Sequence, residues 1–309
     1  NPAGPVSPLA LDRAVAALRA VRVPDLTLRQ TAALLDARRG GTGALRPLFR
    51  ELALSPAALI ASGVEAGLLA ADSGLSRPFA TALDGTLLEW LGATLGATPG
   101  RGGAADTAWR SLPPLHLNLT LPTLLGTAFA AFARRCRVAG AGLGVEVRLE
   151  EAAADPAGFR AARQAAAALG CTIALDGVSH LALLLTRPWA LQADLLKLEW
   201  SPLLAHLPAE EQVELRAALQ AAGPARVVLY GAEDEAALRW GGAQGIRRFQ
   251  GRHVEAMLAA ARLLGCPAAA GCTLSQCAAR AAAGSAAGRA GCRRPDLLEA
   301  GVPGSAAAA

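Results

Sequence analysis

The sequence is poor in lysine, tyrosine and methionine, each of which occurs once. Of the 309 residues, 30 are Lys or Arg, yet Lys197 is the single lysine, Tyr230 the single tyrosine and Met257 the single methionine. Aromatic residues make up only 4% of the chain, which argues against a surface that stacks nucleic-acid bases. The formal net charge of +5 comes without a long basic run, so we predict no nucleic-acid partner.

Cysteine is also scarce, with six residues in the whole chain. This number is too small for a disulfide scaffold at this length. Cys272, Cys277 and Cys292 gather near the C-terminus, but without the CxxC pair or neighbouring histidine that a zinc site uses. We interpret them as small apolar residues on a helix, with an occasional disulfide as the alternative.

Long hydrophobic runs suited to a membrane are missing as well. The longest uncharged stretch, 111–133, contains Pro113, Pro114 and Pro122, so we predict no membrane span. No charged segment followed by an apolar one opens the chain. A cytoplasmic location is therefore expected.

What the chain does contain is a core-building composition, 53% hydrophobic and 18% charged. From about residue 113, short β-prone runs alternate with helix-length segments, as in a parallel sheet. The predicted strands are Leu115–Leu119, Leu143–Arg148, Thr172–Leu175, Leu195–Leu198, Val227–Leu229 and Ile246–Phe249. The predicted helices are 121–137, 156–169, 179–190, 203–222, 233–241 and 252–264.

Two further strands, Thr31–Leu35 and Leu48–Leu54, flank the glycine-rich turn at 40–43 and predict a hairpin. Eight strands with helices outside indicate an α/β fold, a TIM-type (β/α)8 barrel with a hairpin-like first strand pair. An open doubly wound sheet is the alternative. We expect a lead with a short helix (Leu11–Arg22) at 1–22, the barrel at 23–265, and an Ala/Gly/Cys-rich extension at 266–309 that is peripheral or frayed.

Familiar catalytic motifs are missing. The glycines of 140–144 run into a strand instead of opening a helix, which excludes a dinucleotide-binding loop. His116, His180, His206 and His253 show no ligand spacing, and we interpret each as a surface or core histidine.

The informative residues lie at the carboxyl ends of the predicted strands, where barrel active sites form. The polar residues there are Glu51, Asn118, Glu146, Asp176, Lys197, Glu199, Glu233 and Gln250. Carboxylates and an amide that converge with one lysine are typical of a divalent-metal site acting on a phosphate.

Segment 115–257 resembles the EAL domain of cyclic di-GMP phosphodiesterases. The motifs that carry the resemblance are His116-Leu-Asn118-Leu-Thr120, Glu146-Val-Arg148-Leu149, Ala174-Leu-Asp176-Gly177-Val178, Asp194-Leu-Leu-Lys197-Leu-Glu199, Val228-Leu-Tyr230-Gly231-Ala-Glu233 and Gln250-Gly251. Upstream, Gln30 matches the glutamine of the family's Y-Q-P strand, and Glu51-Leu52-Ala53 matches its E-A-L signature.

This resemblance implies a two-metal site, of which two carboxylates are lost. Gly177 stands where the family has its second aspartate, and Tyr230 stands where it has a glutamate. Glu51, Asn118, Glu146 and Asp176 remain as metal-ligand positions, enough for one metal. Glu51, Lys197 and Glu233 are vestigial catalytic positions.

The departures also change the expected ion pairs. Arg148 lies two residues after Glu146 on the same strand face, so we expect its guanidinium to neutralise Glu146. We expect Lys197 to pair with Asp176 or Glu233.

From these losses we predict that the chain is not an enzyme and needs no cofactor, with Mg²⁺ or Mn²⁺ relevant only to residual activity. The leading interpretation is an inactive EAL-like signalling or protein-interaction module, with a protein partner or a homodimer. The first alternative is a receptor that binds cyclic di-GMP without cleaving it, through Gln30, Asn118, Asp176, Lys197 and Gln250. The second is a weak cyclic di-GMP phosphodiesterase.

Overall fold

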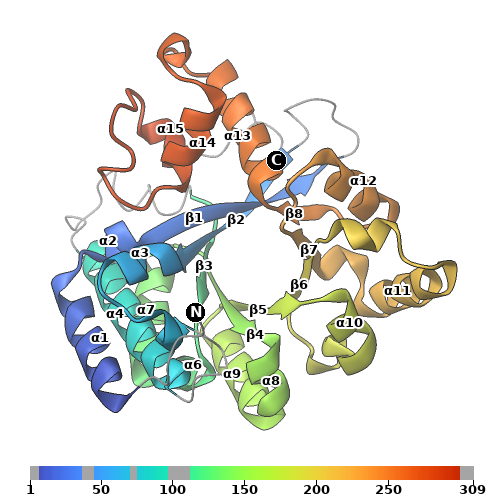
Figure 1. The fold of residues 1–309 in the computed structure, drawn as a ribbon, viewed down its shortest axis with the longest axis horizontal. Coiled ribbons are helices and arrows are strands. Elements are labelled where there is room, and N and C mark those ends of the chain that lie inside the picture. Colours follow the sequence, from blue (N-terminus) through green and yellow to red (C-terminus); the bar gives the residue numbers. More distant parts are fainter. Residues whose placement is uncertain (1–6, 37–44, 70–74, 97–111, 300–309) are drawn as a thin grey trace.

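In a computed structural model, which describes residues 7–36, 45–69, 75–96 and 112–299, the chain forms a closed barrel of eight strands. The strands follow one another around the barrel in chain order (Figure 1). They are β1 (Thr27–Leu35), β2 (Leu45–Leu54), β3 (Leu115–Asn118), β4 (Leu143–Arg148), β5 (Thr172–Val178), β6 (Leu195–Glu199), β7 (Val227–Tyr230) and β8 (Arg248–Gln250). The predicted TIM-type barrel is confirmed, and the open sheet is excluded.

Strand β1 runs against both of its neighbours, whereas β2 to β8 are parallel to one another. This confirms the antiparallel first pair; the glycine turn at 40–43 lies outside the described residues. The strand starts earlier than predicted, at Thr27, so that Gln30 lies within it, opposite Glu51.

Helices surround the strands on the outside of the barrel (Figure 1). The first seven are α1 (Pro8–Ala20), α2 (Val23–Leu26), α3 (Pro56–Ala61), α4 (Ser76–Gly96), α6 (Leu121–Leu124), α7 (Thr127–Ala139) and α8 (Leu149–Ala154). The others are α9 (Pro156–Ala168), α10 (His180–Thr186), α11 (Ala209–Ala222), α12 (Glu235–Ala243), α13 (Arg252–Leu264), α14 (Leu274–Ala282) and α15 (Asp296–Glu299). Among the described helices, none is long and apolar enough to cross a membrane.

Several predicted helices are divided because proline or glycine interrupts them. The predicted helix 121–137 is α6 and α7, separated at Gly126, which is the N-cap of α7. The predicted helix 179–190 ends at Thr186, and Pro188 starts a short 3-10 helix. Proline lacks the backbone donor that a continuing helix needs.

Two apolar clusters hold the fold together. The larger lies between the barrel strands and their covering helices and includes Leu117, Phe129 and Phe159, each with no exposed surface. The smaller joins α1 to α4 through residues such as Leu18 and Phe79. Each fully buried side chain of this size contributes about 1.5–3 kcal/mol to folding.

A buried carboxylate ties α4 to the end of β3. Asp84 on α4 is 6% exposed and accepts hydrogen bonds of 2.8 Å from both the backbone N and Oγ1 of Thr120. Burial raises the pKa of Asp84 to about 6, although the hydrogen bonds from Thr120 and Thr123 act in the opposite direction. The sequence analysis did not identify this contact, because it assigned no element to the region of α4.

Asp84→Asn tests the energetic consequence of this burial. The raised pKa means that the folded chain holds a proton that the unfolded chain has released between pH 4 and pH 6, so stability falls as pH rises through this window. We expect the free energy of unfolding of the native chain to fall by up to about 3 kcal/mol from pH 4 to pH 7 because of Asp84. In Asp84→Asn this contribution to the pH dependence should be absent. Guanidinium titrations at both pH values measure it. Asp12→Asn removes the same charge from an exposed position and is the control; equal pH slopes for native protein and Asp84→Asn would contradict the assignment.

Candidate functional site

Polar side chains from six strands meet inside the carboxyl end of the barrel. Because alternate residues of a strand face opposite sides, apolar residues that adjoin the polar ones pack outward against the helices. Leu117 beside Asn118, Val145 beside Glu146, and Leu196 and Leu198 beside Lys197 all belong to the main core. The inward residues at this level are Glu51, His116, Asn118, Glu146, Asp176, Lys197 and Gln250.

The Lys197 ammonium is the centre of this site. Its Nζ atom lies 2.7 Å from Glu51 Oε2, 2.5 Å from Glu146 Oε2 and 3.5 Å from Asp176 Oδ1. The Lys197 side chain is 4% exposed and that of Glu146 is fully buried. One cation therefore connects β2, β4 and β6, with β5 at a longer distance.

Two side-chain amides and one imidazole nitrogen also contact the carboxylates of Glu51 and Glu146. Asn118 Nδ2 donates to Glu51 Oε1 at 2.6 Å, and Gln250 Nε2 donates to Glu51 Oε2 at 2.6 Å. His116 Nδ1 forms a 3.0 Å hydrogen bond with Glu146 Oε1. Each oxygen of both glutamates thus has a partner, as buried charges require.

His116 is held in place by its packing. Its ring stacks on Phe49 with the centroids 3.7 Å apart and the planes 9° from parallel. Gly144 on the neighbouring strand leaves room for it, since a Cβ there would lie 2.2 Å from His116 Nε2. The interpretation of His116 as a surface or core histidine overlooked its bond to Glu146, although His116 lies two residues before Asn118 and so faces the same interior.

The mutual attraction of these charges outweighs their burial. Burial alone would lower the pKa of Lys197, but the charges of Glu146, Glu51 and Asp176 raise it well above its usual value. Burial would raise the pKa of Glu51, but the Lys197 charge and three hydrogen bonds lower it. Lys197 and Glu51 therefore remain an ion pair across the physiological range.

Tyr230 and Arg148 form the outer rim. Lys197 Nζ lies 5.5 Å from the centroid of the Tyr230 ring. Burial, together with the charges of Asp176 and Glu199, raises the pKa of Tyr230 to about 12, so its phenol is neutral. Arg148 is 58% exposed and donates from Nε and Nη2 to Glu150, at 3.1 and 3.0 Å.

Gly177 lies beneath the Arg148 guanidinium. Its φ of +74° is in the left-handed region that favours glycine. A Cβ at this position would lie 3.4 Å from Arg148 Cζ. The side chain absent at Gly177 therefore leaves space that the guanidinium partly fills.

One ion-pair prediction was wrong, and for Lys197 one of the two predicted partners is present. Arg148 pairs with Glu150 rather than neutralising Glu146, because its exposed end of β4 lets the guanidinium turn to the first turn of α8. Lys197 does not pair with Glu233, which lies outside the barrel, is exposed and pairs with Arg252. The predicted pairing of Lys197 with Asp176 is present as the weakest of its three contacts.

The structure brings together most of the predicted site residues. Glu51, Asn118, Glu146, Lys197 and Gln250 form one bonded cluster, and Asp176 lies at its edge. Gln30 faces Glu51 from β1 and is half-buried. Their predicted roles as ligand, metal or catalytic positions stay predictions.

A divalent metal does not fit the side chains as they are arranged. The Lys197 ammonium already takes one oxygen of Glu51 and one of Glu146, and Asn118 turns its N–H donors toward Glu51. Within the described part of the chain, no three His, Cys, Asp or Glu side chains are placed to hold a metal ion.

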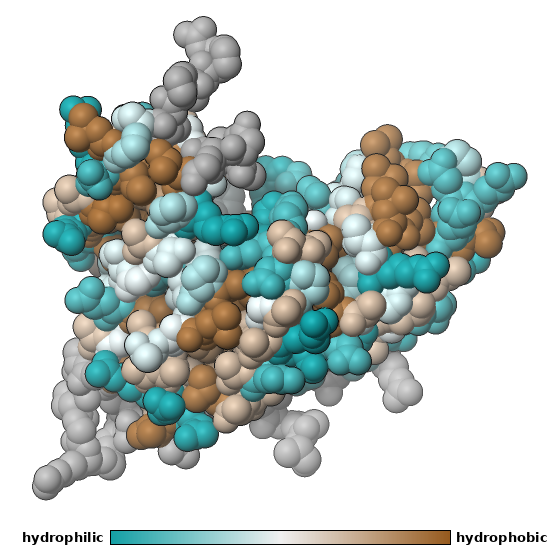
Figure 2. All heavy atoms as spheres, turned by 90° about the horizontal axis from the view of Figure 1, so that it is seen from below, coloured by the Kyte–Doolittle hydropathy of each residue, from teal (hydrophilic) through white to brown (hydrophobic). Residues whose placement is uncertain are grey.

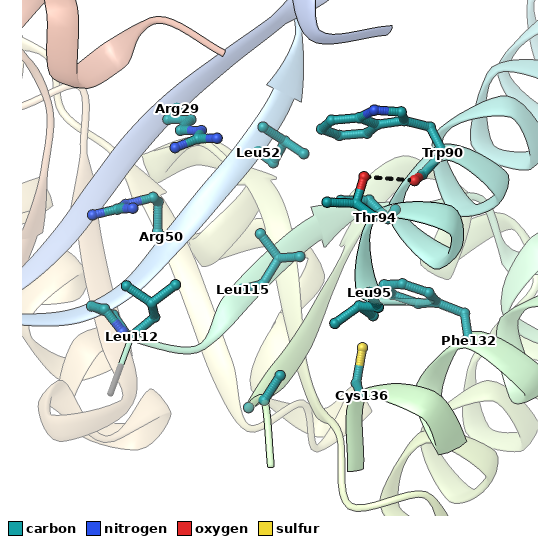
Figure 3. Close-up of a pocket in the computed structure, with 14 residues that line it drawn as sticks. Arg29, Arg50, Leu52, Trp90, Thr94, Leu95, Leu112, Leu115, Phe132 and Cys136 are labelled. Atoms are coloured by element: carbon teal, nitrogen blue, oxygen red, sulfur yellow. Dashed lines mark hydrogen bonds between the residues drawn. The ribbon is translucent and has the colours of Figure 1, made fainter. Parts of the chain in front are cut away.

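A separate pocket lies outside the barrel, between β2, β3 and the helices α4 and α7 (Figure 3). Leu52 and Leu115 line it from the strands, while Trp90 and Phe132 line it from the helices. These strand residues alternate with Glu51 and His116, so the pocket is on the opposite side of the strands from the charged cluster. It is apolar and shares no side chain with that cluster.

Comparisons with solved structures identify the fold. The EAL domain of Pseudomonas aeruginosa FimX, bound to cyclic di-GMP, matches with a TM-score of 0.50 and 13% identity, over 77% of this chain and 93% of that one. Klebsiella pneumoniae BlrP1, in a manganese and cyclic di-GMP complex, matches with a TM-score of 0.48 and 20% identity, over 73% of this chain and 54% of that one. The chain thus spans about half the length of BlrP1. No family model matches the chain, and no curated protein matches its sequence. The fold is that of an EAL-like domain.

The prediction that this chain is not an enzyme is contradicted by these comparisons. Its barrel has the fold of EAL domains. The sequence resemblance connects this class with phosphodiesterases, and nothing in the match sets the chain apart from the active members of the class. The prediction rested on the missing carboxylates at Gly177 and Tyr230, and it took each strand-end position by itself as a metal ligand. That prediction is withdrawn.

Lys197→Met tests the dependence of the barrel on its central cation. Removing the ammonium leaves the buried carboxylates of Glu51 and Glu146 without a countercharge, which we expect to lower stability by about 3–5 kcal/mol near pH 7. The loss is smaller at pH 5, because without the Lys197 charge burial raises the pKa of Glu51, which then gains a proton in the folded state. Thermal melts at both pH values measure this.

The matched control is the triple variant Lys197→Met, Glu51→Gln, Glu146→Gln, which removes the cation together with both anions. It should recover part of the lost stability and lose most of the pH dependence. A melting temperature that Lys197→Met leaves unchanged would contradict a structural role for the cluster.

Proposed function

We propose that this chain is a cyclic di-GMP signalling domain that binds the dinucleotide at the carboxyl mouth of its barrel. The likeness to the FimX EAL domain, solved with this ligand, supports the fold-level part. The main support for binding at the mouth is the position of Arg148, whose exposed guanidinium lies over Gly177 at the rim of the charged cluster. It supplies the cation that a ligand with two phosphates needs.

Arg148 is available to a phosphate at low cost. Its present partner, Glu150, is 69% exposed, and exposed ion pairs contribute only about 0–1 kcal/mol. A phosphodiester oxygen that replaces this carboxylate keeps the charge-assisted hydrogen bonds of the guanidinium. Lys197, by contrast, is already bound to two carboxylates and would have to leave them to reach a ligand.

Binding does not require a divalent metal in this proposal. The carboxylates of Glu51 and Glu146 already have a cation in Lys197. Tyr230 presents a neutral ring on the same rim as Arg148, and aromatic rings and guanidinium planes are the surfaces on which bases stack. The guanine bases of the ligand therefore have two side chains to lie against.

Arg148→Gln tests this assignment by titration calorimetry with cyclic di-GMP. We expect the native chain to bind with EDTA present, and Arg148→Gln to bind about tenfold or more weakly, because a hydrogen bond to a charged group contributes about 1.5–3 kcal/mol. Arg160→Gln, at an exposed position of α9, should bind like the native chain. Equal affinity of Arg148→Gln would contradict the assignment.

The same mixtures, with and without Mg²⁺ or Mn²⁺, should be assayed for the linear dinucleotide, because the fold is that of EAL domains. Metal-dependent hydrolysis would place the chain with the phosphodiesterases and would require Lys197 to move away from Glu51 and Glu146.

A second candidate function is partner binding through α10, for which we propose a second copy of this chain. Leu181 and Leu185 lie one turn apart on α10 and are 55% and 80% exposed, so they form one apolar face. Figure 2 shows strongly apolar surface on the side of the molecule that carries α10, α11 and α12 in Figure 1. Self-association of this kind would cover the face.

Leu185→Glu tests the dimer. We expect light scattering to give a dimer mass for the native chain and a monomer mass for Leu185→Glu, because a carboxylate on the apolar face opposes its burial. Val138→Glu, on α7 and 82% exposed in the native chain, is the matched control and should stay dimeric. A monomeric native chain at all concentrations would exclude this partner.

A further inference from the structure

Four of the six cysteines line one pocket beside the end of α13. They are Cys266, Cys272, Cys277 and Cys292. Cys266 lies just after α13, Cys277 lies on α14, and Cys292 precedes α15. The residues of this pocket all follow the last strand in the sequence. None of them belongs to the charged cluster or to the apolar pocket of Figure 3.

The start of α14 brings two of these cysteines to the same pocket. Thr273 is its N-cap, and a capping box joins it to Gln276: Gln276 N donates to Thr273 Oγ1 at 3.2 Å, and Thr273 N donates to Gln276 Oε1 at 2.9 Å. In such a start, the residue before the N-cap packs against the fourth residue of the helix. These two residues are Cys272 and Cys277.

Two arginines add positive charge to this thiol pair. Arg280, one turn further along α14, donates from Nη1 to Cys272 Sγ at 3.2 Å. Arg262 on α13 lines the same pocket, is 4% exposed, and has no hydrogen-bond partner for Nε or Nη1. Reactive cysteines are found in such electropositive, partly exposed surroundings, whereas buried structural cysteines are not.

The two cysteines differ in accessibility. Cys272 is half-buried and receives the arginine hydrogen bond, while Cys277 is 6% exposed. Burial raises the pKa of the Cys277 thiol, although the Arg262 charge acts in the opposite direction. Cys272 is therefore the sulfur that an outside reagent meets first.

We propose that Cys272 and Cys277 form a redox-active pair that a hydroperoxide converts into a disulfide. The Cys272 thiolate attacks one peroxide oxygen, the O–O bond breaks, and Cys272 becomes a sulfenic acid, while the other oxygen leaves as hydroxide or alkoxide and takes a proton from solvent to give water or an alcohol. The Cys277 sulfur then attacks the Cys272 sulfur, the Cys277 proton and the sulfenic hydroxyl leave together as water, and the S–S bond forms. Two thiols are oxidised by two electrons, and one peroxide is reduced.

The pair is suited to mark the oxidation state without disturbing the barrel mouth. The bond would close a short loop at the start of α14, while the end of α14 meets β1 through the Leu28 and Ala283 bridge and through Gly284 N, which donates to Thr27 O at 3.2 Å. The charged cluster lies on other strands. Formation of the bond can therefore be measured separately from the proposed nucleotide binding.

Peptide mapping of the full chain tests the proposal. After reduction, desalting and treatment with one equivalent of hydrogen peroxide, we expect two thiols per chain to be lost and then recovered with a dithiol reductant. Trypsin cleaves after Arg262 and Arg280, so Cys266, Cys272 and Cys277 stay in one peptide, 263–280, whereas Cys292 falls in 290–293. The expected product is peptide 263–280 with its mass lowered by the two hydrogens of one disulfide.

Variants then assign the two sulfurs. Cys272→Ser and Cys277→Ser should each abolish the bond in peptide 263–280, while Cys266→Ser and Cys292→Ser should retain it. Arg280→Gln should slow thiol loss roughly tenfold, since a hydrogen bond to a charged group is lost, and Arg280→Lys should restore part of the rate.

Three results would overturn the pair. They are a peptide that links 263–280 to 290–293, a bond that survives in Cys272→Ser, and thiols that stay reduced at excess peroxide. Titration with Zn²⁺ alone is a further test. One tightly bound zinc per chain that protects four thiols from oxidation would indicate a metal site and not a redox pair.

Discussion

The structure depends on the placement of one ammonium between two buried glutamates. Lys197 contacts Glu51 and Glu146 at 2.7 and 2.5 Å, and these residues come from β6, β2 and β4. Moving such charges out of water costs several kcal/mol for each ion, and only close pairing with saturated hydrogen bonds offsets that cost. The amides of Asn118 and Gln250 and the ring of His116 supply those bonds, so the interior end of the barrel is one connected electrostatic unit.

This unit constrains apolar positions as well. His116 reaches Glu146 because Phe49 supports one face of its ring and because Gly144 has no Cβ that would collide with it. A larger residue at Gly144 would displace the imidazole and leave one carboxylate oxygen of Glu146 without its partner. An unpaired buried group costs about 1–3 kcal/mol. The glycine on β4 is thus an electrostatic requirement, although it carries no polar side chain.

The alternation of β-prone runs with helix-length segments predicted the barrel well, because each strand and each helix is a local feature of the sequence that needs no tertiary information. Most cluster members were also found, since they lie at or near strand ends, whereas His116 was not assigned to the site. Their ion pairs were not predictable in the same way, because Arg148 and Lys197 each have more than one carboxylate within reach. The buried Lys197 pairs with the buried glutamates, whereas the exposed Arg148 pairs with the exposed Glu150. Cys266 was not grouped with the other C-terminal cysteines, because only the path of the chain after α13 brings it to their pocket.

Two of the positions that differ from the EAL motifs, Arg148 and Gly177, lie next to each other. Relative to the family pattern, Gly177 removes a carboxylate and Arg148 adds a guanidinium, and the two positions touch: a Cβ at Gly177 would lie 3.4 Å from Arg148 Cζ. The left-handed φ of +74° at Gly177 disfavours other residues there. The rim therefore exchanges negative for positive charge at one place. At close range such an exchange favours an anionic ligand over a metal cation, and in the proposed complex the Arg148 charge would offset the negative charges of Glu51, Glu146 and Asp176.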